Sequence, residues 1–247
     1  MRISAYIIIF FAAVVIIGYM WFAYANIYNR IRAGGLKTVD TQYVYILNAS
    51  YPQKIKYAAM GDSLTAGVGT DTYEESYPYV LAEKLAMNRG AILKDFSLLG
   101  ARTEDLIDKN LLKSVIEDSP DIITVFVGVN DVRENISEKE FKSNYENIVN
   151  ELVGGTSAKI YLINIPFIGS DTLYLPPYNF YFKDKTIKFN GIIKDIAIEH
   201  DLGYIDIASS TEEIFKRDGS YYSVDSFHPN KEGYKIFAEI MYDNINH

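Results

Sequence analysis

Three polar residues in this 247-residue chain have the types and positions that nucleophilic catalysis needs. Ser63 follows a short apolar run and has Gly61 before it, so its hydroxyl would lie in an open turn. His228 comes three residues after Asp225, a spacing that lets the carboxylate orient the imidazole. A hydroxyl, an imidazole and a carboxylate can together carry out acyl transfer. The chain has no cysteine, which excludes a cysteine nucleophile and a disulfide framework.

Acyl transfer also needs donors for the developing oxyanion. Asn130 follows a second, nearly continuous apolar run, and its side-chain NH₂ could serve with the backbone N–H groups of Ser63 and Gly100. Each residue has a simpler alternative: Ser63 could cap a helix, Asn130 could fill a turn, and Asp-x-x-His occurs often by chance. The order of these residues along the chain favours the catalytic interpretation.

The elements that must position these residues follow from the hydrophobic pattern. Apolar runs predict strands, and segments of helical periodicity alternate with them. The expected strands cover 55–60, 91–98, 122–127, 159–165 and 204–207, and the expected helices 77–87, 103–116, 137–153, 183–200 and from about 230 onward. This alternation predicts an α/β fold whose parallel sheet has helices on both faces. Ligands bind beyond the carboxyl ends of such strands, where Ser63, Gly100 and Asn130 lie.

Four short blocks then match a known group in order. They are Gly-Asp-Ser-Leu at 61–64, Gly100, Gly-Val-Asn-Asp at 128–131 and Asp-Ser-Phe-His at 225–228. From about residue 55 to the C-terminus the chain resembles the SGNH, or GDSL, hydrolase superfamily, with further similarity to its bacterial lysophospholipase and esterase branch. The resemblance implies a three-layer α/β/α, flavodoxin-like fold.

The resemblance also implies roles for individual residues. Ser63 would be the nucleophile and His228 the base, with Asp225 orienting it. The oxyanion hole would comprise the N–H groups of Ser63 and Gly100 and the side chain of Asn130. No cofactor and no metal site are expected, since the chain has neither a His cluster nor an H-E-x-x-H pattern.

Residues that choose the substrate are harder to predict. Arg102 stands where the family often has threonine, so it could alter the mouth of the site. The aromatic segment 168–182 predicts either a lid or substrate platform, or rings that only pack on the body. The substrate contacts expected from these arguments are Asp62, Arg102, Tyr178 and Tyr222.

A charge-free run at the N-terminus stands apart from the rest. No charged residue falls between Arg2 and Arg30, and residues 3–25 would form a helix of roughly 34 Å, enough to cross a hydrocarbon core of about 30 Å. We therefore expect a transmembrane anchor at 1–32, a linker at 33–52 and a hydrolase domain at 53–247. The alternative is a secretory signal, cleaved after the small-x-small triplet ending at Ala25 and releasing the domain.

Charge bears on the partners and on orientation. Residues 1–36 hold three basic and no acidic residues, which leaves 21 basic and 32 acidic residues, a net charge of −11, in the remainder. An acidic domain of this kind is not expected to bind nucleic acid or an anionic membrane through its own charge. Counting basic side chains around the span favours a cytoplasmic domain, but resemblance to exported bacterial esterases favours the outer face.

Taken together, the sequence predicts a membrane-anchored serine esterase. Its substrate would be a lipid acyl ester, such as a lysophospholipid, or an acylated carbohydrate. One alternative is an O-acyltransferase, in which a sugar hydroxyl on a cell-surface glycan replaces water. A non-catalytic, membrane-tethered binding domain is a further alternative, against which Ser63, Asn130, Asp225 and His228 all argue.

Overall fold

The structure is a computed structural model that describes residues 2–33, 43–166, 169–170, 172–217 and 219–246. Within these residues, one sheet has the strand order β1-β3-β2-β4-β5-β6. The strands are β1 (Val44–Leu47), β2 (Lys54–Gly61), β3 (Gly90–Ser97), β4 (Ile122–Phe126), β5 (Lys159–Ile163) and β6 (Gly203–Ile205). Strands β2 to β6 run parallel, as predicted, and β1 pairs antiparallel with β3.

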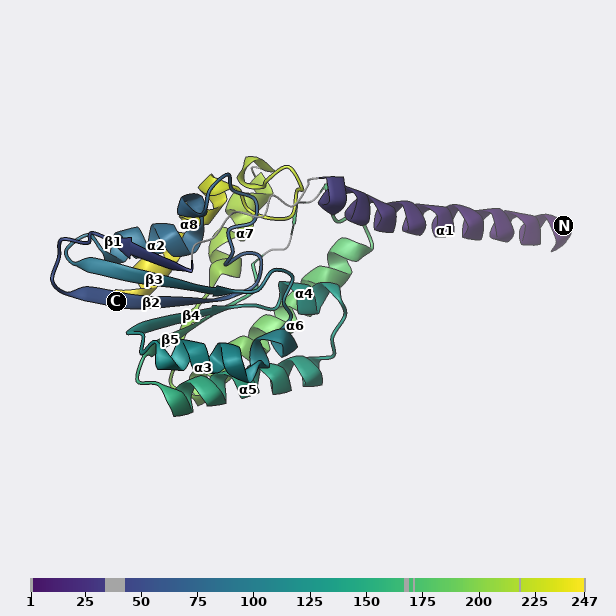
Figure 1. Cartoon of the computed structure of the whole chain (residues 1–247). Coiled ribbons are helices and arrows are strands. Elements are labelled where there is room, and N and C mark those ends of the chain that lie inside the picture. Colours follow the sequence, from purple (N-terminus) through teal and green to yellow (C-terminus); the bar gives the residue numbers. More distant parts are fainter. Residues whose placement is uncertain (1, 34–42, 167–168, 171, 218, 247) are drawn as a thin grey trace.

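Helices cover both faces of this sheet (Figure 1). Helices α2, α7 and α8 lie over one face, and α3, α5 and α6 lie over the other. Their bounds, with those of α1, α4 and the 3₁₀ turns, are α1 (Arg2–Ala33), η1 (Tyr73–Glu75), α2 (Tyr77–Leu85), η2 (Thr103–Ile107), α3 (Lys109–Glu117), α4 (Val129–Arg133), α5 (Glu138–Gly155), α6 (Tyr178–Glu199), α7 (Ile207–Arg217), η3 (Gly219–Tyr221) and α8 (Lys231–Ile245). The three-layer α/β/α prediction is thereby confirmed.

The register of the central strands brings the predicted motifs to one edge. Gly61 at the end of β2 is paired with Ser97 on β3 and with Phe126 on β4. The segments that follow these three residues therefore begin at the same height of the sheet. Strand β4 is buried at all five positions, in keeping with its continuous apolar sequence between two helical layers.

The segment predicted as a linker, 33–52, is only partly one, because it contains β1. Tyr45 and Leu47 point inward and are buried, and the Tyr45 ring stacks on Tyr73 with 4.8 Å between ring centroids. Residues 34–42 lie outside the described part of the chain. Strand β1 covers the outer edge of β3, which would otherwise present unpaired backbone groups.

Several predicted elements have different bounds in the structure, and three of the differences matter here. The helix expected at 103–116 is divided, because the Asp108 carboxylate caps a new helix by accepting hydrogen bonds from the N–H groups of Asn110 and Leu111. The strand expected at 204–207 ends at Ile205 and is followed by α7, which the sequence did not predict. Helix α6 starts at Tyr178, so the aromatic segment 168–182 is partly helical.

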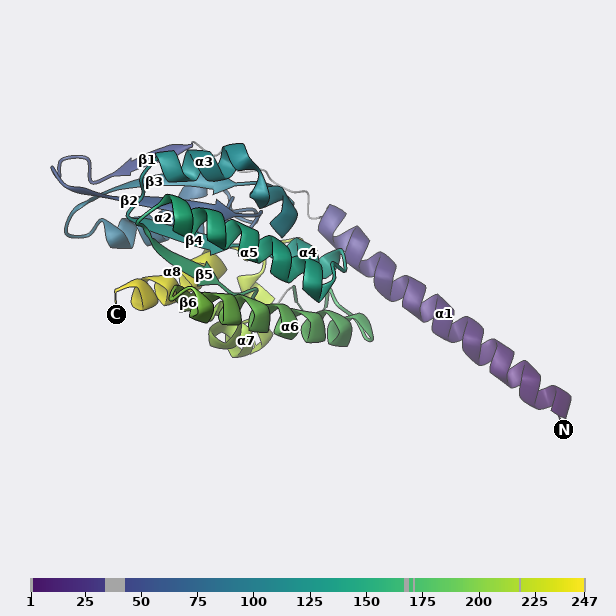
Figure 2. The ribbon, with the colours of Figure 1, turned by 90° about the horizontal axis from the view of Figure 1, so that it is seen from below.

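Helix α1 is continuous and, among the described residues, is the one helix long and apolar enough to cross a membrane. The candidate span is Ala5–Arg32, with a mean hydropathy of 2.4; a signal sequence would pass the same test. Its C-terminal part contacts the domain: Ala23 and Ile27 are buried, and Asn26 Nδ2 donates to the carbonyl oxygens of Thr172 and Leu173 at 3.1 and 3.0 Å. Figures 1 and 2 show α1 leaving from the end of the sheet where α4 follows β4.

Candidate active site

Ser63 lies in the turn that follows β2. The Asp62 carbonyl accepts hydrogen bonds from the N–H groups of Thr65 and Ala66, and the Asp62 carboxylate accepts one from Leu64, so the chain reverses tightly around the serine. Gly61 is needed before this turn, because a Cβ there would lie 2.3 Å from the carbonyl oxygen of Phe126. The Ser63 side chain is mostly buried but keeps some exposure at the edge of the sheet.

His228 joins Ser63 to Asp225. Its Nε2 lies 2.9 Å from Ser63 Oγ, and its Nδ1 lies 2.5 Å from Asp225 Oδ2. The second oxygen, Oδ1, accepts hydrogen bonds from Ser223 Oγ at 2.6 Å and from the N–H groups of Phe227 and His228 at 2.9 Å. These contacts fix the carboxylate, which in turn fixes the imidazole. The sequence motifs do not point to Ser223.

The surroundings of Asp225 favour its ionised form. Burial of the carboxyl acts to raise its pKa, but the hydrogen bond and charge of His228, with the Ser223 hydroxyl and the Phe227 N–H, lower the pKa to about 2. The carboxylate is therefore ionised at neutral pH and can stabilise a positive charge that develops on His228.

The loop that holds Asp225 and His228 is anchored to its neighbours. Tyr222 and Pro229 form an antiparallel bridge across the loop, and the Ser223 N–H donates to the His228 carbonyl at 2.8 Å. Gly69 makes room for this loop: its φ is +106°, and a Cβ there would lie 2.3 Å from the carbonyl oxygen of Pro229. Close approach of these two segments therefore requires glycine at position 69.

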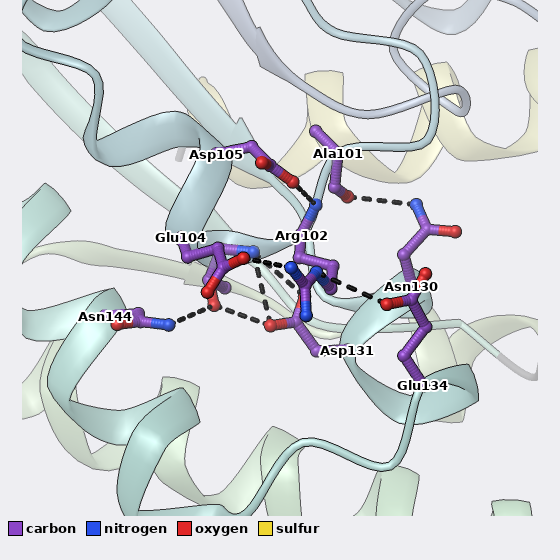
Figure 3. Close-up of polar contacts among 9 residues, drawn as sticks. Ala101, Arg102, Glu104, Asp105, Asn130, Asp131, Glu134 and Asn144 are labelled. Atoms are coloured by element: carbon purple, nitrogen blue, oxygen red, sulfur yellow. Dashed lines mark hydrogen bonds and ion pairs between the residues drawn. The ribbon is translucent and has the colours of Figure 1, made fainter.

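The segment after β3 and the segment after β4 are held together (Figure 3). Asn130 Nδ2 donates to the carbonyl oxygen of Ala101 at 2.9 Å, next to Gly100, whose φ of +73° suits glycine. Within the described part of the chain, the backbone N–H groups of Gly100 and Ser63 have no hydrogen-bond acceptor. Both donors are thus available for an oxyanion.

Asp131, the last residue of the third block, clamps the same two segments. It is fully buried and accepts hydrogen bonds from the Thr103 N–H and, at 2.6 Å, from Thr103 Oγ1. Asn144 on α5 donates to that same hydroxyl at 3.3 Å. Burial raises the pKa of Asp131 despite these hydrogen bonds. The sequence motifs single out neither Thr103 nor Asn144.

Two of the expected substrate contacts lie within two residues of Ser63 or Gly100 in the sequence. Arg102 is partly exposed and forms ion pairs with Glu104 and with Glu134, as Figure 3 shows. Asp62 is fully buried inside the turn, and burial raises the pKa of its carboxyl to about 7. A fully buried carboxyl supports the turn and does not meet a substrate in this conformation, so a substrate contact at Asp62 is not supported.

The two expected tyrosines are held by contacts with neighbouring segments. Tyr222 is buried, and its hydroxyl donates to the Gly169 carbonyl at 3.0 Å. Its ring packs edge-on against Phe215, so Tyr222 supports the loop that holds Asp225 and His228, called the histidine loop below. Tyr178 is half-buried at the start of α6, with its ring 6.2 Å from that of Tyr24 on α1. Substrate contact by either residue stays a prediction.

Comparison with known proteins agrees with this geometry. The profile of the GDSL-like Lipase/Acylhydrolase family matches residues 59–236, more than half of the chain. The chain belongs to this family. As a GDSL-family member it is a carboxylic ester hydrolase, and the resemblance drawn from the four blocks is confirmed.

Relatives of this GDSL-family chain include lipases and esterases. It is 26% identical to the spore germination lipase LipC of Bacillus licheniformis over 207 residues. The aligned region covers 75% of this chain and 93% of LipC. A lipase/acylhydrolase from Enterococcus faecalis has a TM-score of 0.63 and 22% identity, covering 77% of this chain and 95% of that one. The acetyl xylan esterase AlAXEase has a TM-score of 0.62 and 22% identity, covering 77% and 100%. These solved structures share the fold.

Among the described residues of this GDSL-family chain, no group of three or more His, Asp and Glu side chains is placed to hold a metal ion. The chemistry available at the edge of the sheet is that of a hydroxyl, an imidazole, an ionised carboxylate and nearby N–H donors. Such an arrangement can move a proton from Ser63 to His228 while the serine oxygen attacks a carbonyl carbon.

Proposed function

We propose that this chain is a serine esterase that works through a covalent acyl-enzyme. The observation that carries the proposal is the continuous hydrogen-bonded chain from Ser63 through His228 to Asp225, with distances of 2.9 and 2.5 Å. A serine hydroxyl is a weak nucleophile at its ordinary pKa, so a base must take its proton as it attacks. His228 can do so because its Nε2 lies within hydrogen-bond distance of Ser63 Oγ.

In the first half of the reaction, Ser63 Oγ attacks the ester carbonyl carbon and its proton passes to His228 Nε2. The N–H groups of Ser63 and Gly100 and the Asn130 amide hold the oxyanion. His228 then protonates the leaving alcohol oxygen as the carbon–oxygen bond breaks. In the second half, water attacks the acyl group, His228 accepts its proton, and that proton returns to Ser63 Oγ as the acid leaves.

Two substrate classes are compatible with this chemistry. The name of the relative LipC points to lipid esters, and that of AlAXEase points to O-acetyl groups on a glycan. An O-acyltransferase would use the same acyl-enzyme but resolve it with a sugar hydroxyl. Hydrolysis is favoured here because α1 alone, among the described helices, could span a membrane, whereas a membrane-embedded acyl-donor module would need several.

We further propose that α1 is a retained anchor that holds the catalytic domain at the cell membrane, and the resemblance to exported bacterial esterases favours its outer face. Ala23, within the alternative cleavage triplet, is fully buried against the domain, and α1 runs through the triplet without a break. Both observations disfavour cleavage at this triplet once the domain has folded. Fractionation of cells that carry a C-terminally tagged chain tests this: a soluble product lacking about 25 residues would contradict it.

The decisive experiment for the function uses the full chain in detergent micelles. We expect hydrolysis of p-nitrophenyl esters of increasing chain length, lysophospholipids or acetylated glycans, and loss of that activity in Ser63→Ala by at least about three orders of magnitude. A fluorophosphonate probe should label Ser63 in the wild type and leave Ser63→Ala unlabelled. The proposal fails if no substrate shows release that depends on Ser63.

A further inference from the structure

Large apolar side chains are exposed on segments at the carboxyl end of the sheet, the end at which the candidate active site lies. Val224, directly before Asp225, is 87% exposed, and Phe180 in the first turn of α6 is 68% exposed. Three more lie on the segments beside them, and we call the five the apolar rim: Leu98, Leu99, Phe180, Tyr181 and Val224. The rim residues come from segments after β3, at the start of α6 and before α8, all at the carboxyl end of the sheet.

Helix α1 is fastened to this same end. Its Tyr24 ring lies 6.2 Å from that of Tyr178, two residues before Phe180. Arg30 Nη1 donates to Thr172 Oγ1 at 3.3 Å and to Ser226 Oγ at 3.5 Å. Ser226 is the residue after Asp225, so α1 contacts both segments that carry the rim beyond β5.

The length of α1 sets the height of the domain above a membrane. The residues from Arg2 to Phe22 span roughly 30 Å of helix, about the thickness of the hydrocarbon core. Contact with the domain begins at the next residue, Ala23, which is completely buried. Trp21 and Tyr24 flank this point, at the position where aromatic rings favour the headgroup region. A bilayer around α1 would therefore end where the domain begins.

We propose that the apolar rim rests on the bilayer that α1 crosses, and that the active site takes its ester from lipid in that leaflet. This inference rests on the proposed esterase function and on α1 as an anchor, and it selects lipid esters over soluble glycans. The occupant is a lipid surface because α1 contacts Tyr178 and Ser226, each two residues from a rim residue, and the apolar side chains of α1 from residue 6 to 22 are exposed. The domain, with a net charge of −11 from residue 37 onward, needs such apolar contact because its charge does not attract anionic lipid.

The absence of native cysteine allows a direct test with single labels. Phe180 and Ile198 are both 68% exposed on α6, and about 27 Å of helix separates them. Full-length Phe180→Cys and Ile198→Cys carry the same environment-sensitive fluorophore and are reconstituted in phosphatidylcholine vesicles that contain a lipid quencher in the headgroup region. Val224→Cys and Met87→Cys form a second pair, since Met87 follows α2 at the opposite end of the sheet.

We expect quenching at positions 180 and 224 to exceed that at 198 and 87 by about tenfold, since only the rim would be transferred from water to lipid. Equal quenching at 180 and 198 would overturn the proposal. The proposal would also be overturned if the label at position 180 were unquenched and instead reported close approach of two copies. The rim would then be a protein interface. This readout needs no catalysis.

An activity measurement separates the rim from the esterase function. Phe180→Ser should lower hydrolysis of a long-chain ester in vesicles by about tenfold and leave p-nitrophenyl acetate hydrolysis unchanged, whereas Ile198→Ser should change neither. An equal loss on both substrates, or no loss on vesicles, contradicts the lipid-surface proposal. If the wild type hydrolyses no ester at all, the esterase function is wrong, and the quenching pairs still decide where the rim lies.

Discussion

Asn130 has two tasks in the proposed site, because one N–H of its amide already holds the Ala101 carbonyl at 2.9 Å. The other N–H is the one that can meet an oxyanion. Losing the side chain removes an oxyanion donor and also frees the segment that carries Gly100. Both effects act on the transition state more than on the bound ester.

We therefore expect Asn130→Ala to lower kcat on p-nitrophenyl acetate by about two to three orders of magnitude with little change in KM. Asn144→Ala is the control, since Asn144 donates to Thr103 in the same network but comes from α5 and is not one of the proposed oxyanion donors. Its kcat should stay within about threefold of the wild type. Wild-type turnover in Asn130→Ala would remove Asn130 from the oxyanion hole.

Asp62 makes the stability of the domain depend on pH. Burial raises the pKa of its carboxyl to about 7, and Oδ2 has no hydrogen-bond partner in the described residues. The folded chain thus binds this proton more tightly than the unfolded chain. The contribution of the protonated Asp62 carboxyl to the free energy of unfolding is fully present below about pH 4. It is lost as the pH rises through about 7.

Asp62→Asn removes this titration and keeps an oxygen that can accept from the Leu64 N–H. Between about pH 5 and 8 the free energy of unfolding of the wild type should fall relative to that of the variant, by roughly 1 kcal/mol or more. Denaturant unfolding of both proteins at several pH values measures the difference. The carboxyls of Asp95 and Asp131, whose pKa values are also raised, titrate in both proteins and cancel. Parallel curves would contradict a buried, protonated Asp62.

The principal site residues could be predicted because each lies in a short motif beside a strand end or a helix start. Local sequence is enough to recognise such positions, as Ser63 after β2 and His228 before α8 show. The clamp between Asp131 and Thr103 could not be predicted, since these residues are 28 positions apart. They meet only because β3 and β4 lie on either side of β2.

At the scale of elements, the site depends on how closely the segment after Ser63 approaches the histidine loop. A methyl group at position 69 would meet the Pro229 carbonyl and His228 Cβ, at 2.3 and 3.1 Å. Backbone contacts of this kind cannot relax by rotation of a side chain. The segment or the loop must move.

We expect Gly69→Ala to lower the free energy of unfolding by about 1–3 kcal/mol and to reduce kcat, because His228 shifts away from Ser63. Gly191→Ala is a matched control in the interior of α6, where a Cβ meets nothing within 4 Å. That variant should be slightly more stable, by about 0.5–1 kcal/mol, with unchanged activity. Denaturant unfolding and ester hydrolysis report both quantities; unaltered kcat in Gly69→Ala would contradict the close-approach argument.

Elements were predicted best where their sequence pattern was local and strong. The buried run of β4 and the Ser137-capped helix α5 needed no information from elsewhere in the chain. Strand β1 was missed because four apolar residues after a polar stretch become a strand only through the exposed edge of β3. Helix α7 is not predicted: the expected strand at 204–207 includes its first residue, Ile207, and the rest of the helix, to Arg217, is assigned no element.

At the scale of the whole molecule, the contact between α1 and the domain joins residues about 146 positions apart, beyond the reach of any local pattern. Asn26 makes this contact through two hydrogen bonds to backbone carbonyls. We expect Asn26→Ala to loosen the end of α1 and to speed trypsin cleavage after Arg30 by about fivefold in micelles.

Asn244→Ala is the control for this experiment, because among the described residues the Asn244 amide bonds the Ile240 carbonyl within α8 and has no contact with α1. Its cleavage rate after Arg30 should equal that of the wild type. Gel analysis of the fragments over time measures both rates. Equal rates in the two variants would show that the Asn26 hydrogen bonds do not hold α1 to the domain.

The hydrogen bonds of Asn26 and Arg30 have a consequence for how such an enzyme meets its substrate. A domain joined to its anchor by a flexible linker would sample a half-sphere above the membrane. Its rate of hydrolysis would then follow the concentration of ester per unit volume. If α1 is the anchor proposed above, its fixed contact with the domain keeps the nucleophile at a nearly constant height above the bilayer. For a lipid ester in that bilayer, the proposed anchor would confine the search to two dimensions, so turnover should follow the number of ester molecules per unit area.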